Sequence, residues 1–403
     1  MHSIAEWTIL VFLNAKNNLE EFAFPNFKQM ASIGSTPEVN IVVEMGRPKR
    51  HYSDLFGAWS KTLRFHVSQG TKPTEADAIA DLGATNMGDA STLTDFVAWG
   101  RANFPAKRTL LVIWNHGQGW RAPEEDGKPP PPPPVPPHAG HRYVSNDDDT
   151  GDKLYNRAIQ DSLTALLGDE RIDVIAFDAC LMAMVETAYA LRGVARVMVG
   201  SEELEPGTGW NYTRWLAPLV AAKGAMEAAD LGRLMVKGME EEYGDLDATT
   251  LSATELDRAE LLAAAISTFA EAAMPQLDDH LAAFQASRAA CKNYAPGHDL
   301  HSIDLGHYME QIVKGPFPEG LRASARDVLS RLEGAIVANY ASKLRQGKFG
   351  SKGLGIYYPA SGKAHARDPD GEGYAKDNEH FPVEFVQNHK WAEFLRQYWR
   401  MVP

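Results

Sequence analysis

Short and almost continuously apolar runs alternate with amphipathic segments through the first half of the chain. The runs TLLVIW (109–114) and DVIAF (173–177) have hardly any polar position, which is typical of strands buried on both faces of a sheet. The strands predicted in this way are Thr8–Leu13, Asn40–Glu44, Leu63–Val67, Thr109–Trp114, Asp173–Phe177 and Val197–Gly200. The helices predicted between them are Leu19–Ile33, Ser91–Asn103, Tyr155–Leu167, Met182–Arg192 and Thr213–Val220. This alternation predicts an α/β fold with a mostly parallel central sheet flanked by helices.

Beyond about residue 223 the pattern changes to long Ala- and Leu-rich helical runs, such as RAELLAAAISTFAEAAM and ASARDVLSRLEGAIVANYASKL. Two strand-like pieces recur there, at Thr249–Leu256 and Lys352–Pro359, and we expect both to join the main sheet. The predicted organisation is therefore an α/β core over residues 1–222 and a largely helical region over 223–403 that returns strands to the sheet.

A proline tract interrupts the first region. Eight of the nine residues from Pro129 to Pro137 are proline, and such a sequence forms an exposed polyproline II segment that cannot enter a sheet. We therefore expect an insertion loop over residues 121–153. Two interpretations stay open: a plain solvent-exposed insertion, or a spacer that presents a cleavage or docking site nearby.

Composition narrows the classes of function. Of 403 residues, 44% are hydrophobic and 23% charged, which is typical of a globular protein. The net charge of −13 disfavours nucleic-acid binding, because no overall basic field attracts phosphate. No stretch approaches eighteen consecutive apolar residues, so no membrane span is expected. Two cysteines provide no disulfide framework, and the cellular compartment is left open.

Two of the apolar strands end in residues whose side chains can take part in catalysis. One runs into Asn-His-Gly at His116 and Gly117, and another into Asp-Ala-Cys at Cys180. Alone, a Cys on an apolar run is more often an inert core residue. However, the carboxyl ends of parallel strands share one edge of a sheet, so the thiol and the imidazole are expected to meet as nucleophile and general base. Gly117 would allow a sharp turn and present its N–H as an oxyanion donor.

The predicted helix directly after Cys180 has a further consequence. A helix N-terminus stabilises negative charge, so we expect it to lower the pKa of the Cys180 thiol and to raise the thiolate fraction.

Several stretches resemble the clostripain-like cysteine peptidases of the wider caspase and gingipain-type clan. NHGQGW is similar to the catalytic His motif of that family, and FDACLMAMVE is similar to its catalytic Cys motif. The supporting stretches are WTILVFLNAKNNLEEF, NDDDTGDKL, GSEELEPGTGWNY and KGLGIYYP. The resemblance covers most of the chain and is loosest from Asp257 to about Arg345. It implies a caspase-like α/β sandwich and an endopeptidase that cleaves peptides or proteins after Arg or Lys.

By motif position, the resemblance implies that His116 is the base and Cys180 the nucleophile. It also implies that Asp178 is the acidic floor of the pocket for the substrate's basic side chain, where a carboxylate pairs well with a guanidinium. The alternative for Asp178 is a structural cap of the local turn. Glu203 and Glu205 are further candidates for the acidic role, although such glutamates are usually just solvated.

A rival hypothesis is a catalytically degenerate caspase-like scaffold, or a peptide-binding module, with the proline tract as its docking element. The intact His and Cys favour the enzyme, because a scaffold needs neither. We also expect the enzyme to be a monomer without a required cofactor.

Calcium is the one cofactor left open, since the resemblance includes relatives that depend on it. The stretch NDDDTGD is dense in oxygen ligands, but it lacks the spacing and the final Glu of a calcium-binding hand. An acidic turn leading into the helix at Tyr155 is favoured over a metal site. The weak candidate ligands are Asp147, Asp148, Asp149 and Asp152. Lys16 stands where the family usually has an acidic residue, which puts any role of that loop in doubt.

The resemblance also implies self-cleavage between the His and Cys motifs. Basic residues available for such a cut are Arg121, Lys128, Arg142 and Lys153. Pro129 follows Lys128 and makes that bond resistant, and we rank Arg142 and Lys153 above Arg121.

Overall fold

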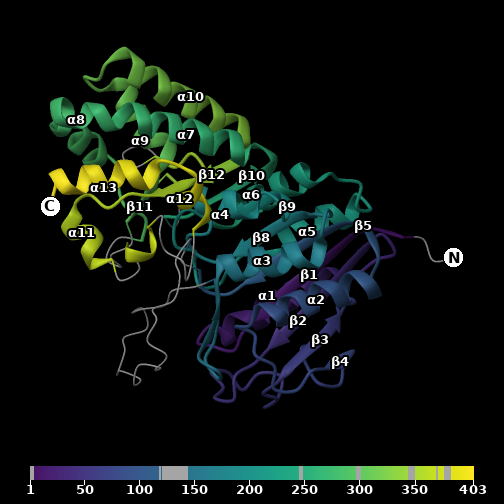
Figure 1. Cartoon of the computed structure of the whole chain (residues 1–403). Coiled ribbons are helices and arrows are strands. Elements are labelled where there is room, and N and C mark those ends of the chain that lie inside the picture. The colour runs from purple at the N-terminus through teal and green to yellow at the C-terminus, as the bar shows by residue number, and fades with distance from the viewer. Residues whose placement is uncertain are drawn as a thin grey trace.

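A nine-stranded sheet forms the centre of the protein (Figure 1). The computed structural model describes residues 4–117, 119, 144–244, 248–295, 301–343, 350–368, 371–375 and 383–403. In spatial order the strands are β12 (Ile336–Ala341), β10 (Thr250–Glu255), β9 (Ala195–Gly200), β8 (Ile172–Asp178), β5 (Ala106–Trp114), β1 (Ala5–Asn14), β2 (Val39–Gly46), β3 (Thr62–His66) and β4 (Ala80–Asp81). Two small antiparallel sheets pair β6 (Ser145–Asp147) with β7 (Asp152–Leu154), and β11 (Ser302–Asp304) with β13 (Gly355–Tyr357).

The inner strands β2, β1, β5, β8 and β9 are all parallel, whereas the outer strands run antiparallel. All six strands expected in the first half are present, so the prediction of a mostly parallel sheet is confirmed. In the register of β5 and β8, Trp114 lies opposite Asp178. The segments that follow these two strands therefore leave the sheet side by side.

Helices cover both faces of the sheet. Alternate residues of each inner strand point to opposite sides, and they are apolar on both sides, so each face must be buried. On β1, Leu10 and Phe12 belong to one core, and Ile9 and Val11 belong to the other. The first face is covered by α2 (Ala90–Asn103), α3 (Asn156–Leu167) and α4 (Val185–Leu191). The second face is covered by α1 (Glu20–Ile33), α5 (Tyr212–Ala221) and α6 (Ala228–Tyr243). This arrangement is the caspase-like α/β sandwich that was predicted.

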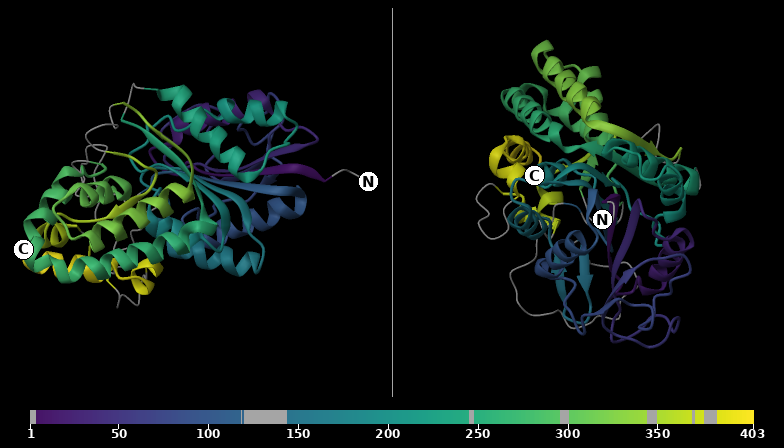
Figure 2. Two further views of the ribbon diagram at one scale, coloured as in Figure 1. Left: turned by 90° about the horizontal axis from the view of Figure 1, so that it is seen from above. Right: turned by 90° about the vertical axis from the view of Figure 1, so that its right-hand side faces the viewer.

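A group of later helices gathers at the end of the molecule farthest from β4 (Figures 1 and 2). The helices after residue 256 are α7 (Ala259–Ala273), α8 (Leu277–Ala290), α9 (Leu305–Lys314), α10 (Glu319–Ala335), α11 (Gly362–Arg367), α12 (Glu384–Asn388) and α13 (Trp391–Met401). The helical C-terminal region is thus confirmed. The division at residue 222 stays a prediction, since strands from both sides of it share the main sheet.

Two details of this region differ from expectation. The segment Lys352–Pro359 does not join the main sheet, because its strand β13 pairs with β11 instead. The place at the edge is taken by β12, from IVANYA, which the sequence had predicted to continue a helix. β-Branched and aromatic residues favour a strand there once β10 offers a pairing edge. The expected strand at Thr249–Leu256 is confirmed as β10.

None of the helices in the described ranges is long and apolar enough to cross a membrane.

Candidate active site

The structure places Gly117, the residue after His116, directly against Cys180 at the carboxyl ends of β5 and β8. The turn after β5 lies directly on the loop after β8: a Cβ built on Gly117 would be 2.2 Å from the Cys180 carbonyl oxygen and 3.0 Å from the Cys180 nitrogen. No side chain fits in that space, so the glycine is required by close approach of two backbones. His116, the residue before it, is half-buried.

The loop that carries Cys180 is held by the segment after β9. The Leu181 N–H donates to the Glu203 carbonyl at 3.2 Å, and the Ala183 N–H donates to the Ser201 carbonyl at 2.9 Å. Leu181 itself has a φ of +62°, a left-handed conformation that costs a bulky residue roughly 1–3 kcal/mol. Strain of this kind is common at functional sites, because surrounding bonds must hold the backbone in one shape.

The helix expected directly after Cys180 begins later than predicted. Helix α4 starts at Val185, not at Met182, and the residues between form a loop. The effect of a helix dipole falls off within its first turn, so α4 does not act on the thiol as we expected.

Burial raises the pKa of the Cys180 thiol to about 12, and the negative charges of Glu205, Glu203 and Asp178 add to this effect. The expectation of a lowered pKa is therefore wrong. The Glu205 N–H donates to the Cys180 sulfur at 3.2 Å, and this contact favours the thiolate, but it does not outweigh burial. The resting group is a thiol, and a base must remove its proton during attack.

His116 is fixed at both its backbone and its ring. Its N–H donates to the Asn115 side-chain oxygen at 2.6 Å, and its Nε2 lies 2.8 Å from Oδ1 of Asn18. Asn18 follows β1, the neighbour of β5 on the side away from Cys180. Sequence reasoning missed Asn18, although the clustering of Asn at the ends of β1 and β5 was a usable signal.

Buried Asp178 and half-buried Glu205 form an acidic pair beside Cys180. Only 4% of Asp178 is exposed, and it shares a side-chain hydrogen bond with Glu205. Burial raises the pKa of Asp178 to about 7. It raises the pKa of Glu205 well above its usual value, and there the Asp178 charge contributes as well. Two adjacent carboxyl groups cannot both ionise cheaply, so they share a proton near neutral pH.

Neutral donors surround this pair. Tyr212 donates its hydroxyl to Asp178 at 3.0 Å, and the Trp210 N–H lies 3.3 Å from both Asp178 oxygens. The Trp210 indole donates to Glu205 at 3.2 Å. Within the part of the chain that the structure describes, no Lys, Arg or His lies within 4.0 Å of either carboxylate as an ion-pair partner. The negative charge of this pair can therefore be neutralised by a cationic group of a bound substrate.

Two neighbours of the pair have roles that the sequence did not reveal. Gly209 has a φ of +62°, and a Cβ on it would lie 2.9 Å from an Asp178 oxygen, so only glycine passes there. Glu203 is bonded elsewhere, since its Oε1 accepts the N–H groups of Leu204 at 3.0 Å and Ala295 at 2.8 Å. These bonds place the acidic pair at Asp178 and Glu205.

The acidic residues 147–152 form the turn between β6 and β7, immediately before α3, as favoured from the sequence. An ammonium already lies among them: Nζ of Lys16 is 3.2 Å from Asp147, both side chains are buried, and it also donates to the Thr85 carbonyl. The other candidate carboxylates accept protein donors, namely Asp148 from Asn146, Asp149 from Lys49 and Asp152 from Asn86. Among the described residues no group of three or more His, Cys, Asp and Glu could hold a metal. These residues do not fit a calcium ion, which would compete with the lysine.

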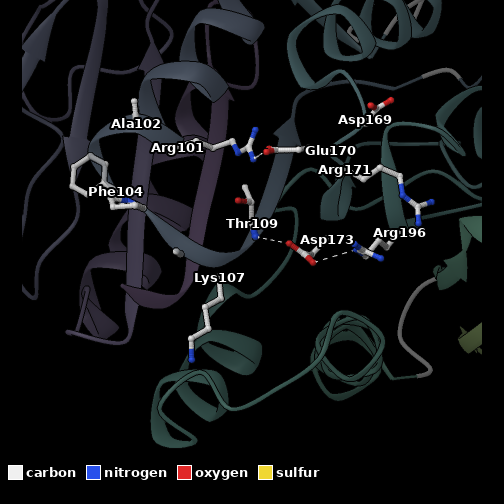
Figure 3. A pocket seen from close by; sticks show the side chains of 12 residues that line it. Arg101, Ala102, Phe104, Lys107, Thr109, Asp169, Glu170, Arg171, Asp173 and Arg196 are labelled. Atoms are coloured by element: carbon white, nitrogen blue, oxygen red, sulfur yellow. Dashed lines mark hydrogen bonds and ion pairs between the residues drawn. The ribbon is translucent and has the colours of Figure 1, made fainter. Parts of the chain in front are cut away.

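A separate cleft of about 720 Å³ lies at the opposite edge of the sheet, where β5, β8 and β9 begin (Figure 3). The arginines that line this cleft pair with carboxylates. Arg101 bonds Glu170, and Arg196 lies 3.6 Å from Asp173. This cleft is far along the strands from Cys180, and it contains none of the predicted site residues.

An α/β sandwich with a Cys and a His at adjacent strand ends defines the caspase-like class of cysteine peptidases. Residues 11–399 match the clostripain family, and the chain belongs to that family. The prediction of a cysteine peptidase, with a peptide or protein as substrate, is thus confirmed at the level of the family.

Individual relatives agree with this assignment. Clostripain of Hathewaya histolytica is 24% identical over 422 residues, which span 89% of this chain and 76% of that protein. A secreted C11 cysteine protease from Bacteroides thetaiotaomicron, solved with an irreversible peptide inhibitor, has a TM-score of 0.63 at 18% identity and covers 97% of this chain and 99% of its own. An inactive zymogen of a C11 protease from Parabacteroides distasonis has a TM-score of 0.59 at 16% identity, with 98% and 99% covered. At these identities the two structures establish the fold.

Proposed function

We propose that the protein is an endopeptidase that cleaves after Arg or Lys with a Cys180–His116 dyad. The observation that carries the specificity is the pair formed by buried Asp178, two residues before Cys180, and half-buried Glu205, for which the described residues supply no cationic partner. An unpaired buried carboxylate is costly, and a substrate guanidinium or ammonium would relieve that cost.

The proposed reaction begins with proton transfer from the Cys180 thiol to His116, because burial keeps the thiol protonated. The sulfur attacks the scissile carbonyl, and the N–H groups of Gly117 and Cys180 bind the oxyanion; the contact between these two backbones supports this role. His116 then gives the proton to the leaving amine. Water, with its proton taken by His116, hydrolyses the acyl-enzyme.

The specificity is tested with fluorogenic peptides that differ only at the residue before the scissile bond: Arg, Lys, or citrulline, which has the shape of Arg without its charge. We expect kcat/KM for the Arg or Lys peptide to exceed that for the citrulline peptide by roughly 30-fold to more than 1,000-fold, since a desolvated charge pair is worth about 2–5 kcal/mol. Equal rates for Arg and citrulline would contradict a charged pocket.

We further propose that activity does not depend on calcium. The Lys16 ammonium supplies the positive charge beside Asp147, so EDTA is expected to change kcat/KM less than twofold and to leave the melting temperature unchanged. In a matched control, Lys16→Met leaves Asp147 unpaired and should destabilise the fold by about 3–5 kcal/mol with or without EDTA. Activity that is lost in EDTA and restored by calcium would overturn this interpretation.

Self-cleavage between the His and Cys motifs remains part of the proposal, and one of the similar structures is an inactive zymogen. Arg121, Lys128, Arg142 and the proline tract lie outside the described residues. Lys153 lies in β7, where it is paired with Asn146 of β6. A peptidase needs an extended, accessible chain, so this pairing favours Arg142 over Lys153 as the site of the cut.

A further inference from the structure

We propose that Asn18 is a positioning residue for His116. Oδ1 of Asn18 lies 2.8 Å from Nε2 of His116, a distance normal for a hydrogen bond. This inference rests on the proposed function, in which His116 is the base that serves Cys180.

The bond selects one tautomer of the imidazole. A side-chain amide oxygen only accepts, so Nε2 must carry the proton that it donates to Asn18. In the neutral ring the proton-accepting nitrogen is then Nδ1, and this nitrogen takes the proton of Cys180 and passes it to the leaving amine. Asn18 thus fixes both the orientation of the ring and the nitrogen that handles the proton.

Asn18 is held rigidly enough to do this. The preceding residue, Asn17, is fully buried, and its amide donates to the carbonyl and side-chain oxygens of Asn146 at 3.1 and 3.2 Å. Its own Oδ1 accepts the Leu19 N–H at 2.9 Å. The turn after β1 is therefore closed on both sides of Asn18 and anchored to strand β6.

The same anchor reaches His116 from the other side. Asn115 donates its amide to the Asn14 carbonyl at 2.6 Å, and its Oδ1 accepts the N–H groups of His116 at 2.6 Å and Asn146 at 3.3 Å. One buried amide cluster therefore holds both the backbone of His116, through Asn115, and its ring, through Asn18. All four members of the cluster are at most 6% exposed, and they are Asn14, Asn17, Asn115 and Asn146.

A neutral partner has a different effect from a carboxylate. Asn18 orients the ring without the strong stabilisation of the imidazolium that a negative charge would give. An Asp in its place would raise the pKa of His116 and hold the ring protonated to higher pH, where it cannot act as a base. This difference separates a positioning role from a merely structural one.

The test compares Asn18→Ala, Asn18→Asp and the wild type on the Arg peptide. Asn18→Ala should lower kcat by roughly 10- to 100-fold, part of the contribution of a general base, with KM changed less than threefold. Asn18→Asp should shift the acidic limb of the kcat/KM profile to higher pH. The matched control is Asn40→Ala, whose amide bonds Thr8 on β1 away from the site, and its kcat should equal that of the wild type.

Three outcomes overturn the proposal, and the first two are an Asn18→Ala kcat equal to wild type and an Asn18→Asp profile without a shift. A loss of activity in Asn18→Ala that is matched by a fall in melting temperature, with no pH shift in Asn18→Asp, also counts against it. His116→Ala separates this failure from failure of the proposed function. If His116→Ala stays fully active, the dyad itself is wrong; if it is inactive while Asn18→Ala is fully active, only the role of Asn18 is wrong.

Discussion

Replacing Cys180 with alanine is expected to abolish peptide cleavage while leaving the fold intact. Without the sulfur no acyl-enzyme forms, and loss of a nucleophile in a hydrolase that works through a covalent intermediate lowers kcat by roughly 10⁴-fold or more. The thiol and a methyl group differ little in volume, so the melting temperature should change by no more than a few degrees. Cleavage of the Arg peptide by purified wild type and variant, with their melting curves, measures both effects.

Chemical labelling identifies the nucleophile independently. Burial raises the pKa of both cysteines to about 12, but Cys180 is partly exposed whereas only 3% of Cys291 is exposed. A peptide label ending in Arg should therefore modify Cys180 alone. Labelling by iodoacetamide should rise steadily with pH, because the resting group is a thiol. A plateau near pH 6–7 would instead reveal a preformed thiolate. Retained activity in Cys180→Ala would show that Cys180 is not the nucleophile.

The same two proteins report on self-cleavage. Aged wild type is expected to split between His116 and Cys180 into two fragments that stay together, because β5 and β8 are neighbours in one sheet. Cys180→Ala should remain one chain. Mass spectrometry locates the cut, and an uncut yet fully active wild type would show that the proline tract is only an insertion.

The sequence was a good guide to the sheet, because burial on both faces leaves a strong signal. Residues 110–114 of β5 and 174–177 of β8 are apolar at every position, and the parallel pairing of the two strands follows from the helix between them. The encounter of Gly117 with Cys180 then follows from topology alone, although 63 residues separate them along the chain. Helical propensity failed at β12, where pairing with β10 decides the structure.

The chemistry of the site was less visible in the sequence, because it depends on contacts between distant segments. The high pKa of Cys180 arises from burial and from neighbouring carboxylates, and α4 starts too late, at Val185, to lower it. The bond from His116 to Asn18 spans 98 residues, and the Lys16–Asp147 pair joins the end of β1 to the turn after β6. A local sequence pattern can indicate that such a residue is a candidate, but it does not predict which distant residue it contacts.

Asp178→Asn is expected to remove most of the preference for basic residues. The variant has the same shape and still accepts hydrogen bonds from Trp210 and Tyr212, but it carries no charge. We expect kcat/KM for the Arg peptide to fall by roughly 30-fold or more, the cost of a lost charge pair, while the citrulline peptide changes less than threefold. Glu203→Gln is the matched control, because Oε1 of Glu203 accepts the backbone N–H groups of Leu204 and Ala295. A drop of equal size for both peptides would make Asp178 structural.

The pH dependence sharpens this last test, because Asp178 has its pKa raised to about 7. The ratio of kcat/KM for Arg over citrulline cancels the titration of His116, and it should rise through about pH 7 in the wild type; the rise should be smaller in Asp178→Asn, where only Glu205 of the pair can ionise. The free energy of unfolding of the wild type should change with pH in the opposite direction.

The pKa of Asp178 is higher in the folded state than the unfolded value near 4, so the buried charge lowers the stability of the wild type as pH rises from about 4 to 7. At pH 8 the variant, which lacks that cost, should melt at the same temperature as the wild type or higher, and at pH 4 this advantage should vanish. A variant that is less stable at pH 8 and equally impaired on both peptides would show that the carboxylate only supports the turn.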